Sequence, residues 1–134
     1  MALAWLLDTN VVSELLRNPQ GKATRELSRV GEDAVCTSVI VAAELRYGAE
    51  KSRSTELKRR LERVLAALEV LALEPPADRH YADIRDHLTR RGTPIDPNDL
   101  LIAAHARSLG LTVVTANERE FSRVPGLAVT NWLA

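Results

Sequence analysis

The stretch 94–106 limits what this chain can fold into more than any other part of the sequence. It predicts a helix start: Asp96 suits the N-cap, Pro97 suits the first helical position, where a missing N–H costs nothing, and Asp99 falls in the first turn. Residues 100–104 are apolar on every side, which is typical of a helix buried over most of its surface. The helix dipole alone explains two acids at this end, and so does a functional site there.

Length and composition are those of one soluble globular domain. The 134 residues, 46% of them apolar and 27% charged, suffice for a buried core, so we expect a single domain over residues 1–134. The one cysteine, Cys36, cannot form a disulfide within the chain. The apolar run 2–7 is too short for a signal peptide or a membrane span, and we expect a cytoplasmic protein with no membrane partner.

Short apolar runs alternate with helical patterns along the chain. Strands are predicted over 2–7, 34–37, 70–73, 111–115 and 128–130. Helices are predicted over 11–16, 22–30, 38–49, 54–70, 77–91 and 94–109. This alternation predicts an α/β domain of three layers, in which helices flank both faces of a mostly parallel central sheet.

Four polar side chains fall where a sheet of this kind gathers its functional groups. Asp8 and Asn117 follow predicted strands, Asp99 begins a helix, and Glu44 lies in the helix after the second strand. Glu44 has only uncharged neighbours on its own helix face, so its carboxylate opens into a cleft, is buried at a cost, or reaches water at a helix edge. Because functional groups collect beyond the carboxyl ends of parallel strands, we expect the four side chains to share one cleft.

A cluster of Asp8, Glu44 and Asp99 would need a proton or a cation in order to form. Two carboxylates about 4 Å apart repel by roughly 1 kcal/mol in water and by about 4 kcal/mol at the effective dielectric constant of a protein surface. Oxygen ligands without convergent Cys or His favour Mg²⁺ or Mn²⁺ over zinc, and the histidines here show no metal-ligand spacing. Because Mg²⁺ prefers phosphate as a further ligand, the cluster would suit hydrolysis of a phosphodiester.

Four motifs in this order resemble those of the PIN-domain nucleases, and most closely those of the VapC-type toxins of bacterial toxin–antitoxin pairs. They are LLDTNV (6–11), AELRYG (43–48), DLLIAAHA (99–106) and VTAN (114–117) followed by Phe121. The likeness continues through VPGL (124–127) to Asn131 and Trp132, and so covers nearly the whole chain. Each motif alone is weak, but their order and spacing make the resemblance specific.

This resemblance implies that Asp8, Glu44 and Asp99 are catalytic residues and metal ligands. A fourth acid is common in the family at the position of Asn117. Asparagine there can still bind a metal-bound water, so Asn117 is a fourth catalytic candidate, but it would hold a second metal ion less firmly.

Four further residues are auxiliary candidates under the same resemblance. Glu120 or Asp96 would compensate for the missing fourth acid, and the sequence does not choose between them. Thr9 and Thr115 would orient waters, or would serve only in packing and turns.

The resemblance also implies an activity and partners. The activity is that of a Mg²⁺-dependent endoribonuclease, in which Mn²⁺ can substitute, acting on RNA as a homodimer. A small cognate antitoxin of the VapB type would block the cleft. Promoter DNA would be bound only indirectly, through that antitoxin.

The chain has no net charge, with 18 basic and 18 acidic residues, but the basic ones are unevenly placed. Several lie between positions 46 and 63, and Arg85, Arg90 and Arg91 follow later. Three interpretations fit this run: a solvated helix face, a path that guides RNA toward an acidic cleft, and a surface that holds an acidic antitoxin segment.

Two other functions fit part of the pattern. Asp8 after a buried first strand would suit a hydrolase that forms a phosphoaspartate, but such enzymes usually carry a second acid two residues on, where this chain has Asn10. A PIN fold kept only for binding or assembly would use the acids as helix caps and would not respond to Mg²⁺.

Overall fold

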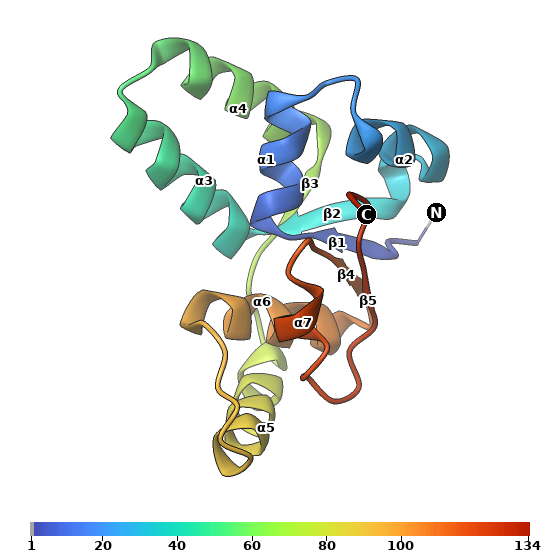
Figure 1. The fold of residues 1–134 in the computed structure, drawn as a ribbon, viewed down its shortest axis with the longest axis vertical. Helices are drawn as coiled ribbons and strands as arrows, with labels where there is room; N and C mark the ends of the chain where they lie inside the picture. The colour runs from blue at the N-terminus through green and yellow to red at the C-terminus, as the bar shows by residue number, and fades with distance from the viewer. Residues whose placement is uncertain (1) are drawn as a thin grey trace.

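The computed structural model describes residues 2–134 and contains one five-stranded sheet (Figure 1). The strands are β1 (Trp5–Leu7), β2 (Val35–Ser38), β3 (Glu69–Leu71), β4 (Thr112–Val114) and β5 (Val129–Thr130). All neighbouring strands are parallel, in the order β3-β2-β1-β4-β5. β1 is central, and its Leu7 lies opposite Thr37 of β2 and Val114 of β4.

Helices cover both faces of this sheet. On one side, above the sheet in Figure 1, lie α1 (Thr9–Arg17), α2 (Lys22–Val30), α3 (Val39–Ser52) and α4 (Thr55–Ala67). On the other side lie α5 (Ala77–Arg90), α6 (Pro97–Leu109) and α7 (Glu118–Phe121), with α5 packed on α6. The predicted three-layer α/β/α architecture is confirmed, and the sheet is parallel throughout. None of the helices in residues 2–134 has the length and apolar character needed to cross a membrane.

The core lies between these layers and is built mainly from the central strands. Leu7 and Val113 have no solvent exposure, because parallel strands with helices on both faces bury both sets of side chains. In α6, Ile102 and its alanine neighbours are also buried, so the prediction of a helix buried over most of its surface is confirmed. Cys36 lies in the same core as a free thiol, and burial raises its pKa to about 12, which makes the thiol unreactive.

α6 begins where its sequence predicts. Asp96 is its N-cap, and the Asp96 carboxylate accepts the N–H groups of Asn98 and Asp99. Pro97 stands at the first helical position. Gly110 ends the helix with φ at 70°, a left-handed conformation that glycine adopts without the strain a Cβ would bring.

Several predicted boundaries are wrong by a few residues. The first helix begins at Thr9 rather than at residue 11, because Asp8 already serves as its N-cap. The fourth helix ends at Ala67 and does not reach residue 70, because Glu69–Leu71 pair with β2. The first strand is shorter than predicted, and the short helical segments Glu32–Ala34 and α7 are not indicated by the sequence pattern.

Candidate active site

α1, α3 and α6 begin close together at the carboxyl ends of the central strands, at the left-hand end of the sheet in Figure 1. α1 and α3 begin there because they directly follow β1 and β2, and α6 begins there because it runs back across the sheet to enter β4 from the opposite edge. The arrangement brings Asp8, Glu44 and Asp99 together from three separate parts of the sequence. A chain of hydrogen bonds from side-chain and backbone donors connects them.

Asp8 is buried directly after β1, with 3% of its surface exposed. Its N–H donates to the carbonyl of Val114, so Asp8 extends the pairing of β1 with β4. One carboxylate oxygen accepts the N–H of Thr9 at 2.8 Å. The other accepts the hydroxyl of Thr115 at 2.7 Å and the amide of Asn10 at 3.1 Å. Burial raises the pKa of Asp8, and these hydrogen bonds oppose the rise.

Glu44 reaches the cluster from α3 and is partly exposed. The hydroxyl of Thr9 donates to its Oε1 at 2.6 Å, and the side-chain amide of Asn98 donates to its Oε2 at 3.3 Å. Residues of α1, α3 and α6 therefore meet at this one carboxylate. Glu44 also lines a cavity of about 360 Å³ between α1, α3 and α4, so it faces a cleft rather than open water at a helix edge.

Asp99 lies in the first turn of α6 and has the most perturbed acidity of the cluster. Burial raises the pKa of Asp99 to about 7, and the negative charges of Asp8, Glu120, Asp96 and Glu44 contribute to the rise. Burial is the largest cause of this shift, and the rest reflects the negative charge gathered around Asp99. A bound cation would relieve the same repulsion.

Asn117 connects two acids of the cluster. Its Nδ2 donates to Oε2 of Glu120 at 2.6 Å and, over 3.4 Å, to Oδ2 of Asp99. Glu120, on α7, uses its other oxygen to accept the N–H of Asp96 at 2.6 Å. Asn117 joins Glu120 directly to Asp99, whereas Asp96 uses its Oδ1 to cap α6, so Glu120 is the better placed of the two acids between which the sequence does not choose.

The donor set of this cluster fits a divalent cation of the Mg²⁺ type, because it consists of carboxylate oxygens. Within residues 2–134, no group of three or more His, Cys, Asp or Glu side chains is arranged to hold a metal ion as it stands. Glu44 and Glu120 each use both carboxylate oxygens to accept hydrogen bonds from protein donors. Each of these oxygens keeps a second lone pair, so a bound cation would require the carboxylates to move closer together rather than to lose these hydrogen bonds.

Two asparagines take part in the cluster although the sequence analysis does not assign them to it. Asn10 accepts the N–H of Ala116 at 2.9 Å and donates to Asp8, so it joins the loop after β4 to the end of β1. Asn98 donates to Glu44. The sequence feature that could have identified them is their proximity to the candidate acids, since each asparagine stands one or two residues from one of these acids. An amide can satisfy carboxylate lone pairs without adding charge.

Many of the basic residues between positions 46 and 63 are already paired. Arg46, Lys58 and Arg59 form ion pairs with acids on α3 and α4. Arg60 donates to a backbone carbonyl of α1. Lys51 forms no ion pair with any residue in the range 2–134. A solvated, ion-paired surface thus accounts for much of this run, and Lys51, Arg53 and Arg63 have no ion pair within residues 2–134.

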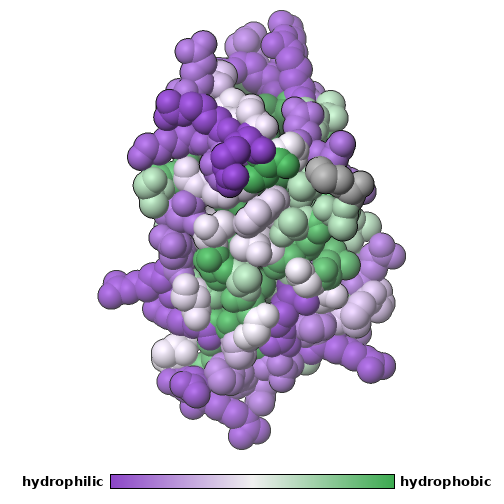
Figure 2. Space-filling model, turned by 90° about the vertical axis from the view of Figure 1, so that its right-hand side faces the viewer, coloured by the Kyte–Doolittle hydropathy of each residue, from purple (hydrophilic) through white to green (hydrophobic). Residues whose placement is uncertain are grey.

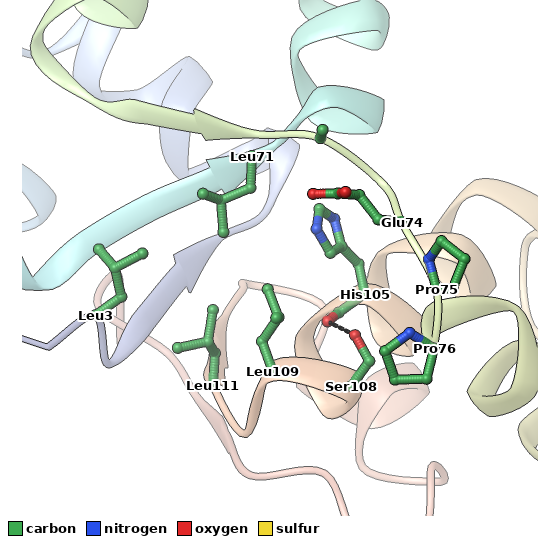
Figure 3. A pocket seen from close by; sticks show the side chains of 10 residues that line it. Leu3, Leu71, Glu74, Pro75, Pro76, His105, Ser108, Leu109 and Leu111 are labelled. Atoms are coloured by element: carbon green, nitrogen blue, oxygen red, sulfur yellow. Dashed lines mark hydrogen bonds between the residues drawn. The ribbon is translucent and has the colours of Figure 1, made fainter.

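A cavity of about 420 Å³ lies on the α6 side of the sheet and contains none of the cluster's acids. Figure 3 shows Leu3, Leu109 and Leu111 on one side of it, and His105 beside Glu74 on the other. Figure 2 shows a face of the molecule on which apolar side chains gather in the middle, framed by polar ones. The cavity's mainly apolar lining separates it chemically from the carboxylate cluster.

Comparison with known proteins adds to this geometry. The PIN domain family matches residues 5–127 of the chain. The tRNA(fMet)-specific endonuclease VapC of Salmonella typhimurium is 41% identical over 131 residues, which make up 97% of this chain and 98% of that protein. Ribonuclease VapC2 of Haemophilus influenzae is 40% identical over 134 residues, 98% of this chain and 99% of that protein.

The likeness extends to solved structures. The crystal structure of VapBC2 from Rickettsia felis, bound to a DNA fragment from its promoter, contains a chain that superimposes with a TM-score of 0.91. That chain is 33% identical, and the match covers 98% of this chain and 99% of the other. Nearly the whole fold is therefore shared, including the strand and helix ends that carry the carboxylates.

Proposed function

This chain belongs to the PIN-domain family, among the VapC-type toxins, and from that premise we propose that it hydrolyses phosphodiester bonds in RNA with the help of a divalent metal ion. The observation that carries the proposal is the cluster of Asp8, Glu44 and Asp99, in which burial and the neighbouring acids raise the pKa of Asp99 to about 7. Relatives that match the chain from end to end bear the names endonuclease and ribonuclease.

In this proposal, Asp8, Glu44, Asp99 and Glu120 hold one or two Mg²⁺ ions, for which Mn²⁺ can substitute. A cation held there supplies positive charge that stabilises the attacking and leaving oxygens of a phosphodiester. Asn117 contributes a donor to two of these acids and no charge of its own. The carboxylates, two of them from short Asp side chains near the backbone, supply the hard oxygen ligands that such ions prefer.

The protein's own contribution is to hold these oxygens in place before the substrate binds. Donors from Thr9, Asn10 and Thr115 satisfy both oxygens of Asp8. The amide of Asn117 keeps Asp99 and Glu120 adjacent despite their repulsion. Groups that are preorganised in this way need little rearrangement during the reaction, and this is the main source of electrostatic catalysis.

Partners form the second part of the proposal. The relatives from Rickettsia felis and Salmonella typhimurium are known as VapBC structures with DNA bound. By analogy, a VapB-type antitoxin covers the carboxylate cluster of this chain, and promoter DNA is contacted through that antitoxin. We also propose that the chain forms a homodimer, as a single PIN domain over residues 1–134.

The proposal is tested by cleavage of RNA with purified protein in Mg²⁺, in Mn²⁺ and in EDTA. Asp8→Asn and Asp99→Asn should abolish cleavage while circular dichroism shows an unchanged fold, and EDTA should abolish it in the wild type. Asp86→Asn, which removes only an exposed ion pair with Arg90, is the control and should cleave normally. If purified Asp99→Asn, free of contaminating nuclease, cleaved RNA at the wild-type rate, the assignment of the activity to this cluster would be wrong.

A metal titration separates this function from a PIN fold kept only for binding. A ligand that binds only the folded state raises the unfolding temperature. Mn²⁺ should therefore stabilise the wild type and leave Asp99→Asn almost unchanged. If Mn²⁺ has no effect on the wild type either, the binding or assembly function is the correct one. If Mn²⁺ does stabilise the wild type and RNA is cleaved, mapping cleavage ends across total RNA, beside Asp8→Asn, would identify the target.

A further inference from the structure

We propose that Tyr47 and Lys51 on α3 bind the nucleotide next to the cleaved phosphodiester, with its base stacked on the Tyr47 ring and a backbone phosphate paired with the Lys51 ammonium. This inference rests on the proposed ribonuclease function and deepens it, because the carboxylate cluster supplies chemistry but no surface that attracts RNA.

Tyr47 is unusual among the aromatic side chains of this chain. With 69% of its surface exposed, it is the most exposed large apolar side chain in residues 2–134, and its hydroxyl has no hydrogen-bond partner there. The other aromatic rings are engaged: Trp5 packs against Trp132 with ring centroids 5.9 Å apart, Phe121 is buried, and the guanidinium of Arg85 lies over Tyr81. A single exposed apolar residue is ordinary in itself, so the position of Tyr47 carries the argument.

Tyr47 stands one helical turn beyond Glu44 on the same face of α3. Residues three apart on a helix are surface neighbours, and a rise of 1.5 Å per residue puts Tyr47 about 4.5 Å along the axis from Glu44. Lys51 lies one turn further, about 10 Å from Glu44 along the axis. An acid of the cluster, an aromatic ring and a cation therefore follow one another along one helix face.

The charges around Tyr47 favour RNA over an apolar partner. The ring stands between the carboxylate of Glu44 and the ammonium of Lys51, so no continuous apolar surface extends along this face. Lys51 has no ion pair within residues 2–134, whereas Arg46 and Lys58 nearby are paired with acids. A free cation next to an exposed ring is the combination with which single-strand binders hold a phosphate and a base.

The order of the three groups matches the order of groups along an RNA strand. With the scissile phosphate at the carboxylates, the adjacent base reaches Tyr47 and the next phosphate reaches Lys51. Every base has a π face, so stacking adds affinity with little preference for sequence. The two residues thus position the substrate and take no part in the chemical step.

The experiment measures binding of a short single-stranded RNA by fluorescence anisotropy in the inactive Asp99→Asn background, and steady-state cleavage in the active protein. Tyr47→Ala should weaken binding about 5- to 100-fold and raise KM while kcat stays within about twofold. Tyr47→Phe should restore binding and Tyr47→Leu should not, because only the first keeps a ring. Leu109→Ala, at the far end of α6 and half exposed, is the control and should bind normally.

The salt dependence of binding tests Lys51. Lys51→Ala should reduce the slope of log K against log salt by about 0.7, the value for one phosphate contact on a single strand, and Lys51→Arg should retain it. Unchanged RNA binding and KM in Tyr47→Ala would overturn the inference, and the proposed function would stand if Asp99→Asn still abolished cleavage. A wild type that neither binds nor cuts RNA would overturn both. A change of oligomeric mass in Tyr47→Ala, measured by sedimentation, would assign this face to a second copy of the chain.

Discussion

The hydroxyl of Thr115 donates a hydrogen bond over 2.7 Å to Oδ2 of Asp8, a residue 107 positions away in the sequence. Both residues are buried, and the bond joins the end of β4 to the end of β1. A carboxylate out of contact with water is strongly penalised unless donors satisfy its oxygens. Thr115 is therefore part of what allows a buried acid to stand at the centre of the cluster.

Removal of this donor should destabilise the protein. Thr115→Val keeps the shape of the side chain and leaves an oxygen of Asp8 short of one donor, at a cost of about 1–3 kcal/mol in the free energy of unfolding. Because the Thr115 hydrogen bond lowers the pKa of Asp8, its loss should also raise that pKa further. Urea denaturation at pH 7 measures the first effect, with Thr115→Ser as the control that keeps the hydroxyl. Equal stability of Thr115→Val and the wild type would contradict this role.

Asp99 should destabilise the metal-free protein at neutral and alkaline pH. Its pKa of about 7 in the folded protein lies above the ordinary value of 3.8, so ionisation opposes folding increasingly from about pH 4 and fully above about pH 7. Asp99→Asn should therefore be more stable than the wild type in EDTA at pH 8, by roughly 2 kcal/mol after allowance for its partial exposure.

The same substitution should lose this advantage at acidic pH, where the wild-type carboxyl group is protonated. Urea denaturation in EDTA at pH 8 and at pH 5 measures the free energy of unfolding of both proteins. With Mn²⁺ at pH 8, the wild type should instead be the more stable of the two. A lower stability of Asp99→Asn than of the wild type at pH 8 in EDTA would show that repulsion within the cluster is unimportant.

Substitutions should show that Asp96 has a structural role and that Glu120 has a metal-binding role. Asp96→Ala removes the N-cap of α6 and should cost about 1 kcal/mol of stability while Mn²⁺ affinity changes little. Glu120→Gln keeps the size of the side chain and removes one charge of the cluster, so it should weaken Mn²⁺ binding with little loss of stability. Isothermal titration calorimetry and urea denaturation provide the two readouts. The reverse pattern would assign the fourth ligand to Asp96.

His105 is a buried histidine of α6. Its Nδ1 lies 2.8 Å from the hydroxyl of Ser38, the N-cap of α3, and its Nε2 has no hydrogen-bond partner within residues 2–134. Figure 3 shows the ring beside Glu74 at the edge of the cavity. Burial lowers the pKa of His105, although the nearby carbonyl of Ala72 and the charge of Glu74 oppose this.

A buried histidine that remains neutral should make stability depend on pH. Because the folded pKa lies below the unfolded value of about 6.5, the stabilising contribution is complete above that pH and is lost as the pH falls toward the folded pKa. The free energy of unfolding of the wild type, relative to His105→Gln, should therefore be larger at pH 7.5 than at pH 5.5. Urea denaturation at both pH values measures this difference, and a difference independent of pH would count against it. Contributions from other titrating groups cancel in the comparison.

The sequence was most informative where a local pattern decides the structure. The start of α6 at Pro97 and the span of α2 follow from caps and apolar spacing, which act over a single helical turn. Prediction was weaker at β3, because Leu68 and Val70 suit a helix and a strand equally. The pairing of β3 with β2 decided between them. α7 was missed because a helix of one turn has no periodicity to detect.

The sequence by itself determined the alternation of strands and helices, and with it that Asp8, Glu44 and Asp99 belong at one edge of a parallel sheet. Only the tertiary structure decided which donor binds which carboxylate. Asn98 donates to Glu44, and Asn117 donates to both Asp99 and Glu120. The Asp96 carboxylate caps its own helix. The physical reason is one of range. Caps and apolar spacing are set by neighbours along the chain, whereas a hydrogen bond near 3 Å depends on how elements far apart in sequence pack against each other.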